Sequence, residues 1–283
     1  MTAIRPRRSV LYMPGSNARA LEKARDIPAD ALILDLEDAV APDAKDVARQ
    51  QVVDAVSAKG FGKREVIVRV NAPSTSWGGA DITAVAAVRP DAILIPKVSE
   101  PSDLLRVAER APGVALWAMI ETPLAILNIA ALAAAGRGLA CFVMGTNDLV
   151  KEMRGEHMKD RANLAASLGL SVMAARAHGL AVIDGVFNDI QDGDGFAAQC
   201  RQARAFGFDG KTLIHPSQVG PCNDIFAPSA DEIAAARKII AAFELPQNKD
   251  KGAIKLDGRM VEILHADIAR RTVALADAIE QLA

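Results

Sequence analysis

The chain has 283 residues, of which 51% are hydrophobic and 4% aromatic, and its 33 basic and 35 acidic side chains leave a formal net charge of -2. This length exceeds the usual size of one domain, but it suits a single α/β barrel with a terminal addition. The balanced charge, without a Lys/Arg stripe interleaved with aromatic residues, argues against nucleic acid as a partner and favours a small molecule.

Eight short apolar runs rich in Val, Ile, Leu or Ala recur along the chain. They are residues 9–13, 31–36, 66–70, 92–95, 116–120, 141–144, 181–183 and 211–214. Ala-rich stretches of helical character lie between them, including residues 103–110, 123–135, 164–177 and 195–206. Parallel strands buried on both faces give continuous apolar runs, and eight strand–helix alternations are typical of a closed barrel. We therefore predict an α/β fold, a (β/α)8 TIM barrel over residues 1–244.

A further segment follows the predicted barrel. Residues 230–243 have the pattern of a helix, residues 245–255 are polar and typical of a linker, and residues 258–282 carry apolar side chains at helical spacing. An apolar stripe outside a complete barrel needs a partner surface. We expect residues 245–283 to form a C-terminal helical extension that packs on its own barrel or on a neighbouring subunit, which favours a homo-oligomer.

Cysteine usage and hydropathy bear on the compartment. Cys141, Cys200 and Cys222 lie far apart and form no Cys-x-x-Cys pair, which suits a reducing compartment and indicates core or surface thiols. No apolar stretch approaches the roughly 20 residues that span a bilayer. We expect a cytoplasmic protein without a membrane partner.

Barrel enzymes carry their chemistry at the carboxyl ends of the strands. Polar or turn-forming residues follow the predicted strands at Pro14, Gly15, Glu37, Asp38, Arg69, Asn71, Lys97, Glu121, Asp148, Asp184 and His215. Glu121 and Asp148 follow adjacent strands, so they should converge about one strand spacing, ~4.8 Å, apart. One or two carboxylates with several waters suit Mg²⁺. The alternative is that each residue only begins the helix that follows it.

Arg69 would point a planar fork of donors into the same mouth. There it could hold a carboxylate or a developing oxyanion, or else form an internal ion pair with Glu37 or Asp38. Glu37 and Asp38 would support Arg69 and a metal-bound water. The alternative for this pair is a strand exit into a capped turn.

Two other strand-end residues have weaker functional interpretations. Lys97 could form a Schiff base in metal-independent aldol chemistry, or an ion pair with Glu37, Asp38 or Glu121. His215 has no second histidine in a motif beside it, so we expect it to shape its loop. The chain contains no Gly-x-Gly-x-x-Gly, Walker or Gly-x-Ser-x-Gly motif, which argues against dinucleotide, P-loop and serine-hydrolase chemistry.

Eight short motifs occur in order along nearly the whole chain. They are RSVLYMPGSN at residues 8–17, LDLEDAV at 34–40, VRVN at 68–71, IPK at 95–97, IETP at 120–123, GTNDL at 145–149, IHP at 214–216 and LDGRM at 256–260. Together they resemble the citrate lyase β-chain-like family of CoA-ester lyases, in the HpcH/HpaI aldolase superfamily, which includes malyl-CoA lyases, citramalyl-CoA lyases and malyl-CoA thioesterases.

The resemblance implies a Mg²⁺-dependent carbon–carbon lyase that acts on a 3-hydroxyacyl-CoA, such as malyl-CoA or citramalyl-CoA, and gives an acyl-CoA plus glyoxylate or pyruvate. A malyl-CoA thioesterase on the same site and the β-chain of an acyl-carrier-dependent citrate lyase complex are the alternatives. It further implies Mg²⁺, with Mn²⁺ as a substitute, at Glu121 and Asp148, and contact of Arg69 with an oxygen of the oxoacid or the thioester enolate.

The resemblance also implies roles outside the metal pair. Asp257 would reach a neighbouring subunit's barrel as an acid/base in a trimer or hexamer, although from the residues alone it would be the N-cap of the last helix. CoA would bind near Ser16, Asn17, Arg19 and Lys23, whose alternative is a solvated amphipathic helix. Many relatives have an acidic residue where this chain has Asn147, which bears on substrate choice.

Overall fold

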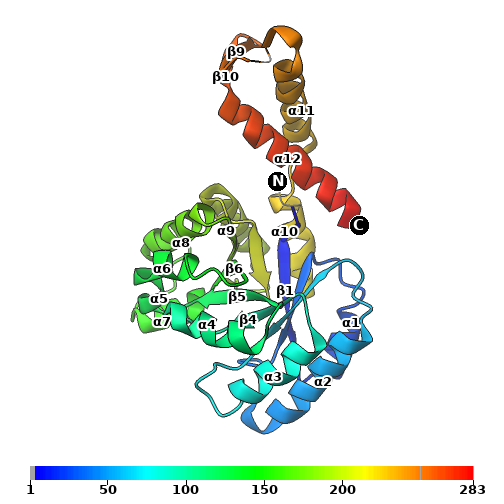
Figure 1. The fold of residues 1–283 in the computed structure, drawn as a ribbon, viewed down its shortest axis with the longest axis vertical. Coiled ribbons are helices and arrows are strands. Elements are labelled where there is room, and N and C mark those ends of the chain that lie inside the picture. The colour runs from blue at the N-terminus through cyan, green and yellow to red at the C-terminus, as the bar shows by residue number, and fades with distance from the viewer. Residues whose placement is uncertain (1–3, 249, 283) are drawn as a thin grey trace. The chain divides into compact units, whose positions relative to one another are not determined.

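The structure is a computed structural model that describes residues 4–248 and 250–282 (Figure 1). The chain forms two compact units. One contains residues 7–224, and the other contains residues 225–282 together with residues 4–6.

The larger unit is a closed barrel of parallel strands that pair in sequence order. The strands are β1 (Ser9–Pro14), β2 (Ala31–Asp35), β3 (Glu65–Arg69), β4 (Ala92–Ile95), β5 (Ala115–Ile120), β6 (Leu139–Met144), β7 (Ala181–Asp184) and β8 (Gly210–Leu213). β1 pairs with β8, with Val10 opposite Thr212, and this pairing closes the ring. The predicted TIM barrel is confirmed, and each predicted apolar run overlaps one strand.

Helices flank the strands of this unit (Figure 1). They are α1 (Ala18–Lys23), α2 (Lys45–Ala58), α3 (Gly78–Val88), α4 (Pro101–Arg110), α5 (Pro123–Leu127), α6 (Ile129–Ala133), α7 (Thr146–Glu152), α8 (Ala165–Ala177), α9 (Gly193–Phe206) and α10 (Val219–Phe226), the last of which ends in the second unit. The single helix predicted over residues 123–135 is divided at Asn128. The Asn128 side chain donates to the Ser99 carbonyl at 3.0 Å, and this bond holds the break.

The barrel core is built from strand residues that point to its interior, including Ile33, Leu94 and the fully buried Trp117. All three cysteines are free and buried, which agrees with the interpretation of them as core thiols. Among the described residues, no helix is both long enough and apolar enough to cross a bilayer.

The second unit pairs a helical hairpin with a two-stranded sheet. Its elements are α11 (Ala230–Glu244), β9 (Ala253–Leu256), β10 (Arg259–Glu262) and α12 (Ile263–Leu282). The predicted helix over residues 230–243 is confirmed. The segment predicted as a linker instead contains β9, and the helix predicted from residue 258 begins only at Ile263.

The turn between β9 and β10 explains this difference. Leu256 pairs with Arg259, so the hairpin loop is Asp257-Gly258, with φ values of 50° and 79°. A two-residue hairpin turn with positive φ at both positions favours Asp-Gly. Asp257 is therefore a turn residue, and the N-cap position suggested by the residues alone is wrong.

Apolar side chains of the second unit divide between a small core and an exposed set. Phe243, Ile254 and Ala266 are buried together where α11 and α12 lie side by side. Four others are exposed, at 75%, 47%, 49% and 60% in turn: Met260, Ile263, Leu264 and Ile268. The apolar stripe predicted in this segment therefore exceeds what the unit itself buries.

A buried ion cluster ties β7 to β8. Asp184 accepts from Lys211 Nζ at 2.7 Å and from Arg161 Nη1 at 2.7 and 2.9 Å, and the Asp184 and Lys211 side chains are fully buried. Burial acts to raise the pKa of Asp184, but the charges of Lys211 and Arg161 lower it. The carboxylate is therefore the common counter-ion of two buried cations.

We expect Asp184→Asn to reduce the free energy of unfolding by about 3–5 kcal/mol, because it leaves two buried cations without a charge partner. The control is Asp267→Asn, which removes an exposed i,i+3 pair with Arg270 and should change stability by less than about 1 kcal/mol. Urea unfolding measures both. Equal effects of the two substitutions would contradict the role given to Asp184.

Candidate active site

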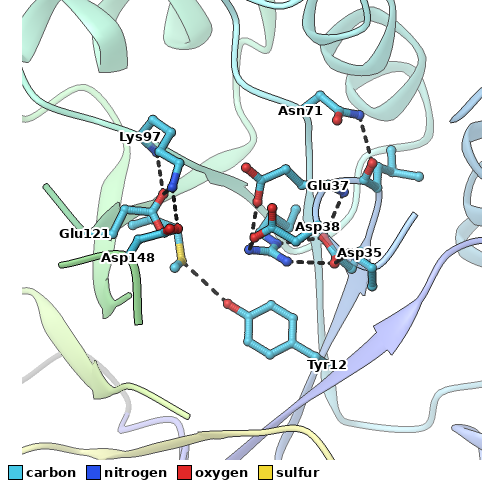
Figure 2. A network of polar contacts seen from close by, with 12 residues as sticks. Tyr12, Asp35, Glu37, Asp38, Asn71, Lys97, Glu121 and Asp148 are labelled. Carbon is cyan, nitrogen blue, oxygen red and sulfur yellow. Dashed lines mark hydrogen bonds and ion pairs between the residues drawn. The ribbon is translucent and has the colours of Figure 1, made fainter. Parts of the chain in front are cut away.

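Two carboxylates and one ammonium meet at the carboxyl ends of β4, β5 and β6 (Figure 2). Glu121 Oε1 accepts from the Lys97 backbone N–H at 2.7 Å, and Lys97 Nζ lies 3.6 Å from the same oxygen. The ammonium also donates to Asp148 Oδ2. The convergence of Glu121 and Asp148 expected from their adjacent strands is present, and Lys97 forms one of its anticipated ion pairs, the one with Glu121.

Local backbone structure sets this geometry. Lys97 has a φ of 55°, a left-handed conformation that is uncommon for a residue with a side chain. Thr122 caps α5 in place of Glu121, accepting from Ala125 N at 3.0 Å, so the Glu121 carboxylate faces the mouth. Gly145 packs directly on Glu121, and a Cβ there would overlap its side chain. A helix therefore begins here, as the sequence suggested, but the Glu121 carboxylate does not cap it.

The charges of this group favour a cation. The Glu121 side chain is 2% exposed, and burial raises its pKa while the Lys97 ammonium opposes that rise. Burial acts to lower the pKa of Lys97, but Asp148 and Glu121 raise it. The amine is thus held in its protonated form, which is the opposite of what a Schiff-base nucleophile needs.

The donor set fits Mg²⁺. Two carboxylates already share one cation, and the Asp148 side chain is 26% exposed, which leaves room for water ligands. Within residues 4–248 and 250–282, no cluster of three or more His, Cys, Asp or Glu side chains has the spacing of a metal site. Two oxygen ligands completed by water are what Mg²⁺ usually takes from a protein.

Arg69 lies beside this group and has three carboxylate partners. Its Nε and Nη2 donate to the two oxygens of Asp35 at 2.6 and 2.7 Å. Its Nη1 lies 2.8 Å from Glu37 Oε2 and donates to Asp38 Oδ2 at 3.2 Å. The ion pairs with Glu37 and Asp38 that the sequence suggested are present, but the two-point partner is Asp35.

Asp35 was not assigned a role from the sequence, although it lies inside the LDLEDAV motif. In the β2–β3 register Asp35 stands opposite Arg69. Its oxygens also accept from the backbone N–H groups of Glu37 and Ala39 at 2.9 and 3.0 Å. The carboxylate therefore fixes both the guanidinium plane and the loop that carries Glu37 and Asp38.

Tyr12 on β1, labelled in Figure 2, packs its ring against the Arg69 guanidinium. Its ring centroid lies 4.9 Å from Arg69 Cζ, a cation–π distance. The hydroxyl contacts Met119 Sδ at 3.5 Å, and Met119 lies on β5, which ends one residue before Glu121. Burial raises the pKa of Tyr12, so the phenol stays neutral.

A second polar network, which the sequence analysis did not predict, holds the loop that follows β2. Lys45 Nζ donates to the carbonyls of Leu36 and Glu37 and to Asn71 Oδ1, each at 2.7 Å. Asn71 donates through Nδ2 to Asp81 at 2.6 Å. The clue available in the sequence was the helical spacing of Lys45 from Ala48, Val52 and Val56, which places the lysine on the apolar face of α2.

The remaining predicted residues lie elsewhere. Ser16, Asn17, Arg19 and Lys23 are exposed on or before the six-residue α1, and Asn17 caps that helix through Ala20 N at 3.0 Å. His215 caps a short 3-10 turn, which confirms its loop-shaping role. Asp257 belongs to the second unit, where it pairs with Lys238 at 2.5 Å.

The sequence profile of the HpcH/HpaI aldolase/citrate lyase family matches residues 8–216, which include strands β1 to β8 of the barrel. The chain belongs to this family. The resemblance found in the eight motifs is thereby confirmed, and the enzymes of the family include lyases and thioesterases of CoA esters.

Individual relatives are similar over nearly the whole chain. The (3S)-malyl-CoA thioesterase of Cereibacter sphaeroides strain KD131 is 52% identical over 97% of this chain and 96% of its own length. The L-malyl-CoA/β-methylmalyl-CoA lyase of C. sphaeroides ATCC 17025 is 34% identical over 97% and 96%. The citrate lyase subunit beta of Escherichia coli K12 is 34% identical over 96% and 94%.

Among solved structures, protein CitE from Mycobacterium tuberculosis in complex with magnesium, acetoacetate and coenzyme A is 28% identical. It has a TM-score of 0.81 and covers 98% of this chain and 100% of its own.

Glu37 gives the site a pH dependence. Burial raises the pKa of this carboxyl from 4.5 to about 8, an effect that the Arg69 charge opposes and the Asp38 charge reinforces. The folded chain thus keeps a proton that the unfolded chain loses at lower pH. Between these two values stability falls as pH rises, by at most about 1.4 kcal/mol per pH unit.

We expect Glu37→Gln, which resembles the protonated form, to reduce the stability difference between pH 5 and pH 8 by at least about 1 kcal/mol. Urea unfolding at the two pH values measures it. Glu109→Gln, at an exposed position, is the control and should keep the wild-type difference. A wild-type difference in Glu37→Gln would show that Glu37 ionises normally.

Proposed function

We propose that this chain is a Mg²⁺-dependent thioesterase. Its substrate would be a 3-hydroxyacyl-CoA of the malyl-CoA class, whose thioester bond it hydrolyses. Carbon–carbon cleavage of the same substrate is the second candidate. The observation that carries the proposal is the meeting of Glu121 and Asp148 at one cation position beside an anchored Arg69. Hydrolysis takes first place because the 52% identical relative is a thioesterase, whereas the malyl-CoA lyase relative is 34% identical.

Glu121 and Asp148 would hold the metal, with Mn²⁺ as a substitute for Mg²⁺. When bound there, the ion would polarise substrate oxygens and bind water. The magnesium complex of the M. tuberculosis relative supports this assignment.

Arg69 would receive the oxygen on which negative charge develops. Asp35 holds one edge of the guanidinium through Nε and Nη2, whereas Asp38 contacts Nη1 at 3.2 Å with a side chain that is 66% exposed. A substrate oxygen can therefore replace Asp38 without tilting the guanidinium. Such a preorganised donor contributes roughly 3–4 kcal/mol to stabilising an oxyanion.

Protons would move on two carboxyl groups. Glu37 lies 2.8 Å from Arg69 Nη1, and while it keeps the proton that burial favours, it can donate a hydrogen bond to the same substrate oxygen. In hydrolysis, water adds to the thioester carbonyl, Asp257 accepts the proton of that water and passes it to the departing sulfur, and the carbon–sulfur bond breaks to give the acid and the CoA thiol. In cleavage, the 3-hydroxyl loses its proton, the carbon–carbon bond breaks, and Asp257 protonates the thioester enolate.

The CoA moiety would lie along α1, with Ser16 and Asn17 as hydrogen-bonding groups and Arg19 and Lys23 as phosphate partners. These side chains are exposed and follow β1, whose end borders the mouth. Because α1 has only six residues, we assign the attraction to the side-chain charges. A cytoplasmic location is part of the proposal and agrees with the three free cysteines.

We expect the purified chain to release thiol from malyl-CoA or citramalyl-CoA with Mg²⁺ and none with excess EDTA. Thiol and oxoacid are followed separately, because cleavage gives an oxoacid while the product remains a CoA thioester. Arg69→Ala should lower turnover by about 100–1,000-fold, and Glu109→Gln, at an exposed position of the barrel unit, should not. Oxoacid without thiol would replace hydrolysis by cleavage. Inactivity on both esters would favour a carrier-bound substrate, as for a citrate lyase β-chain.

Residues 245–283 would pack on a neighbouring subunit of a homo-oligomer, a trimer or hexamer, so that Asp257 enters that subunit's site. The exposed Met260, Ile263, Leu264 and Ile268 support this, since an apolar set of this kind marks an interaction surface.

We expect Arg69→Ala and Asp257→Asn subunits, each inactive alone, to regain roughly a quarter of wild-type turnover when mixed in one oligomer, because some sites combine an intact barrel with an intact tail. Co-expression with two tags isolates the mixed species. The control mixture of Arg69→Ala and Glu121→Gln carries both defects in the barrel and should stay inactive. No recovery in the first mixture would place Asp257 in its own chain's site or outside catalysis.

A further inference from the structure

The Lys97 ammonium occupies the position at which the two carboxylates converge. It donates to Asp148 Oδ2 and lies 3.6 Å from Glu121 Oε1, and the Lys97 backbone N–H also binds Glu121 Oε1. Figure 2 shows these contacts as one connected group. One residue therefore supplies both the main-chain donor and the side-chain cation.

The three side chains differ in their freedom to move. Glu121 is 2% exposed, and a Cβ on Gly145 would overlap it, so its position is fixed. Lys97 is 36% exposed, has a flexible four-carbon stem, and lines a cavity of about 390 Å³ that also borders Pro73, Ser74 and Asp103. The ammonium can leave the carboxylates, whereas the main-chain bond to Glu121 can remain.

We propose that Lys97 is a resident counter-ion that pairs Glu121 and Asp148 while the metal site is empty and withdraws when a divalent ion binds. The inference rests on the metal site of the proposed function. Without a cation between them, the neighbouring carboxylates of Glu121 and Asp148 would repel each other, so the ammonium keeps both side chains in place. A divalent ion bound to the same carboxylates would repel the ammonium at contact distance, so metal binding favours its withdrawal. Lys97 is thus a positioning residue that weakens metal affinity.

We expect Lys97→Met to bind Mg²⁺ about tenfold more tightly than the wild-type chain, since it removes a unit charge next to the ion. Calorimetric titration of the full-length protein with MgCl₂, without substrate, measures this. Lys97→Arg, which keeps the charge, should stay within about threefold of wild type, and Lys159→Met, which removes an exposed charge on another loop, should too.

A second measurement uses the wild-type chain. Mg²⁺ should increase the rate at which an amine-reactive acylating reagent modifies Lys97, followed by mass spectrometry, because withdrawal from Asp148 exposes the amine. In Asp148→Asn the rate should be high with or without Mg²⁺. Lys159 serves as the internal reference, with a rate that Mg²⁺ leaves unchanged.

The outcomes separate this inference from the metal site itself. Unchanged or weaker Mg²⁺ binding by Lys97→Met, or a labelling rate that Mg²⁺ does not raise, would overturn the counter-ion role while the metal site stands. Absence of Mg²⁺ binding to the wild-type chain would overturn the metal site and the inference together.

Discussion

The mouth of this barrel depends on one electrostatic constraint: a charge buried at a strand end needs a partner from a neighbouring strand. Closing eight parallel strands brings many polar strand ends together where little water reaches them. The chain meets this need with three groups. Asp35 pairs with Arg69 across β2 and β3, Lys97 joins Glu121 and Asp148 across β4 to β6, and Asp184 joins Lys211 and Arg161 near β7 and β8.

The three groups differ in whether any partner can be exchanged. In the β7–β8 group, Asp184 and Lys211 are fully buried and Arg161 is 5% exposed. Replacing any of the three by a ligand would leave a buried charge without its partner, at a large cost in free energy. In the other two groups one member is accessible, Asp38 beside Arg69 and Lys97 beside Asp148. Chemistry belongs where a substrate oxygen or a cation can substitute for such a member. We therefore expect the β7–β8 cluster to stabilise the barrel, and the proposed site lies over β2 to β6.

Much of this was predictable because strands and their order follow from simple patterns. The buried parallel strands were recognisable in the sequence as apolar runs. Because β5 and β6 are adjacent in the barrel, Glu121 and Asp148 could be expected to meet. Asp35 was harder, because its meeting with Arg69 depends on the exact β2–β3 register. The left-handed backbone at Lys97 has no signal in residue type. In the tail, helical spacing of apolar residues continued across β10 and hid the Asp257-Gly258 turn, although that dipeptide is itself a hairpin signal.

The geometry of the barrel mouth is also compatible with the different names of the relatives, some of which are thioesterases and others lyases. Both reactions place negative charge on the thioester oxygen, so the roles proposed for Arg69 and for the two carboxylates as metal ligands would serve either one. The reactions differ in how that charge arises: in hydrolysis it develops as water adds to the carbonyl, whereas in cleavage it develops as the carbon–carbon bond breaks, and a proton then reaches the α-carbon. That choice belongs to groups that approach from outside the barrel's strand ends. In this chain the group proposed for it is Asp257, which projects from a two-residue turn with a 65% exposed side chain. Selection between the two outcomes is therefore expected to lie in the C-terminal unit and its docking, while the barrel supplies the part that both reactions share.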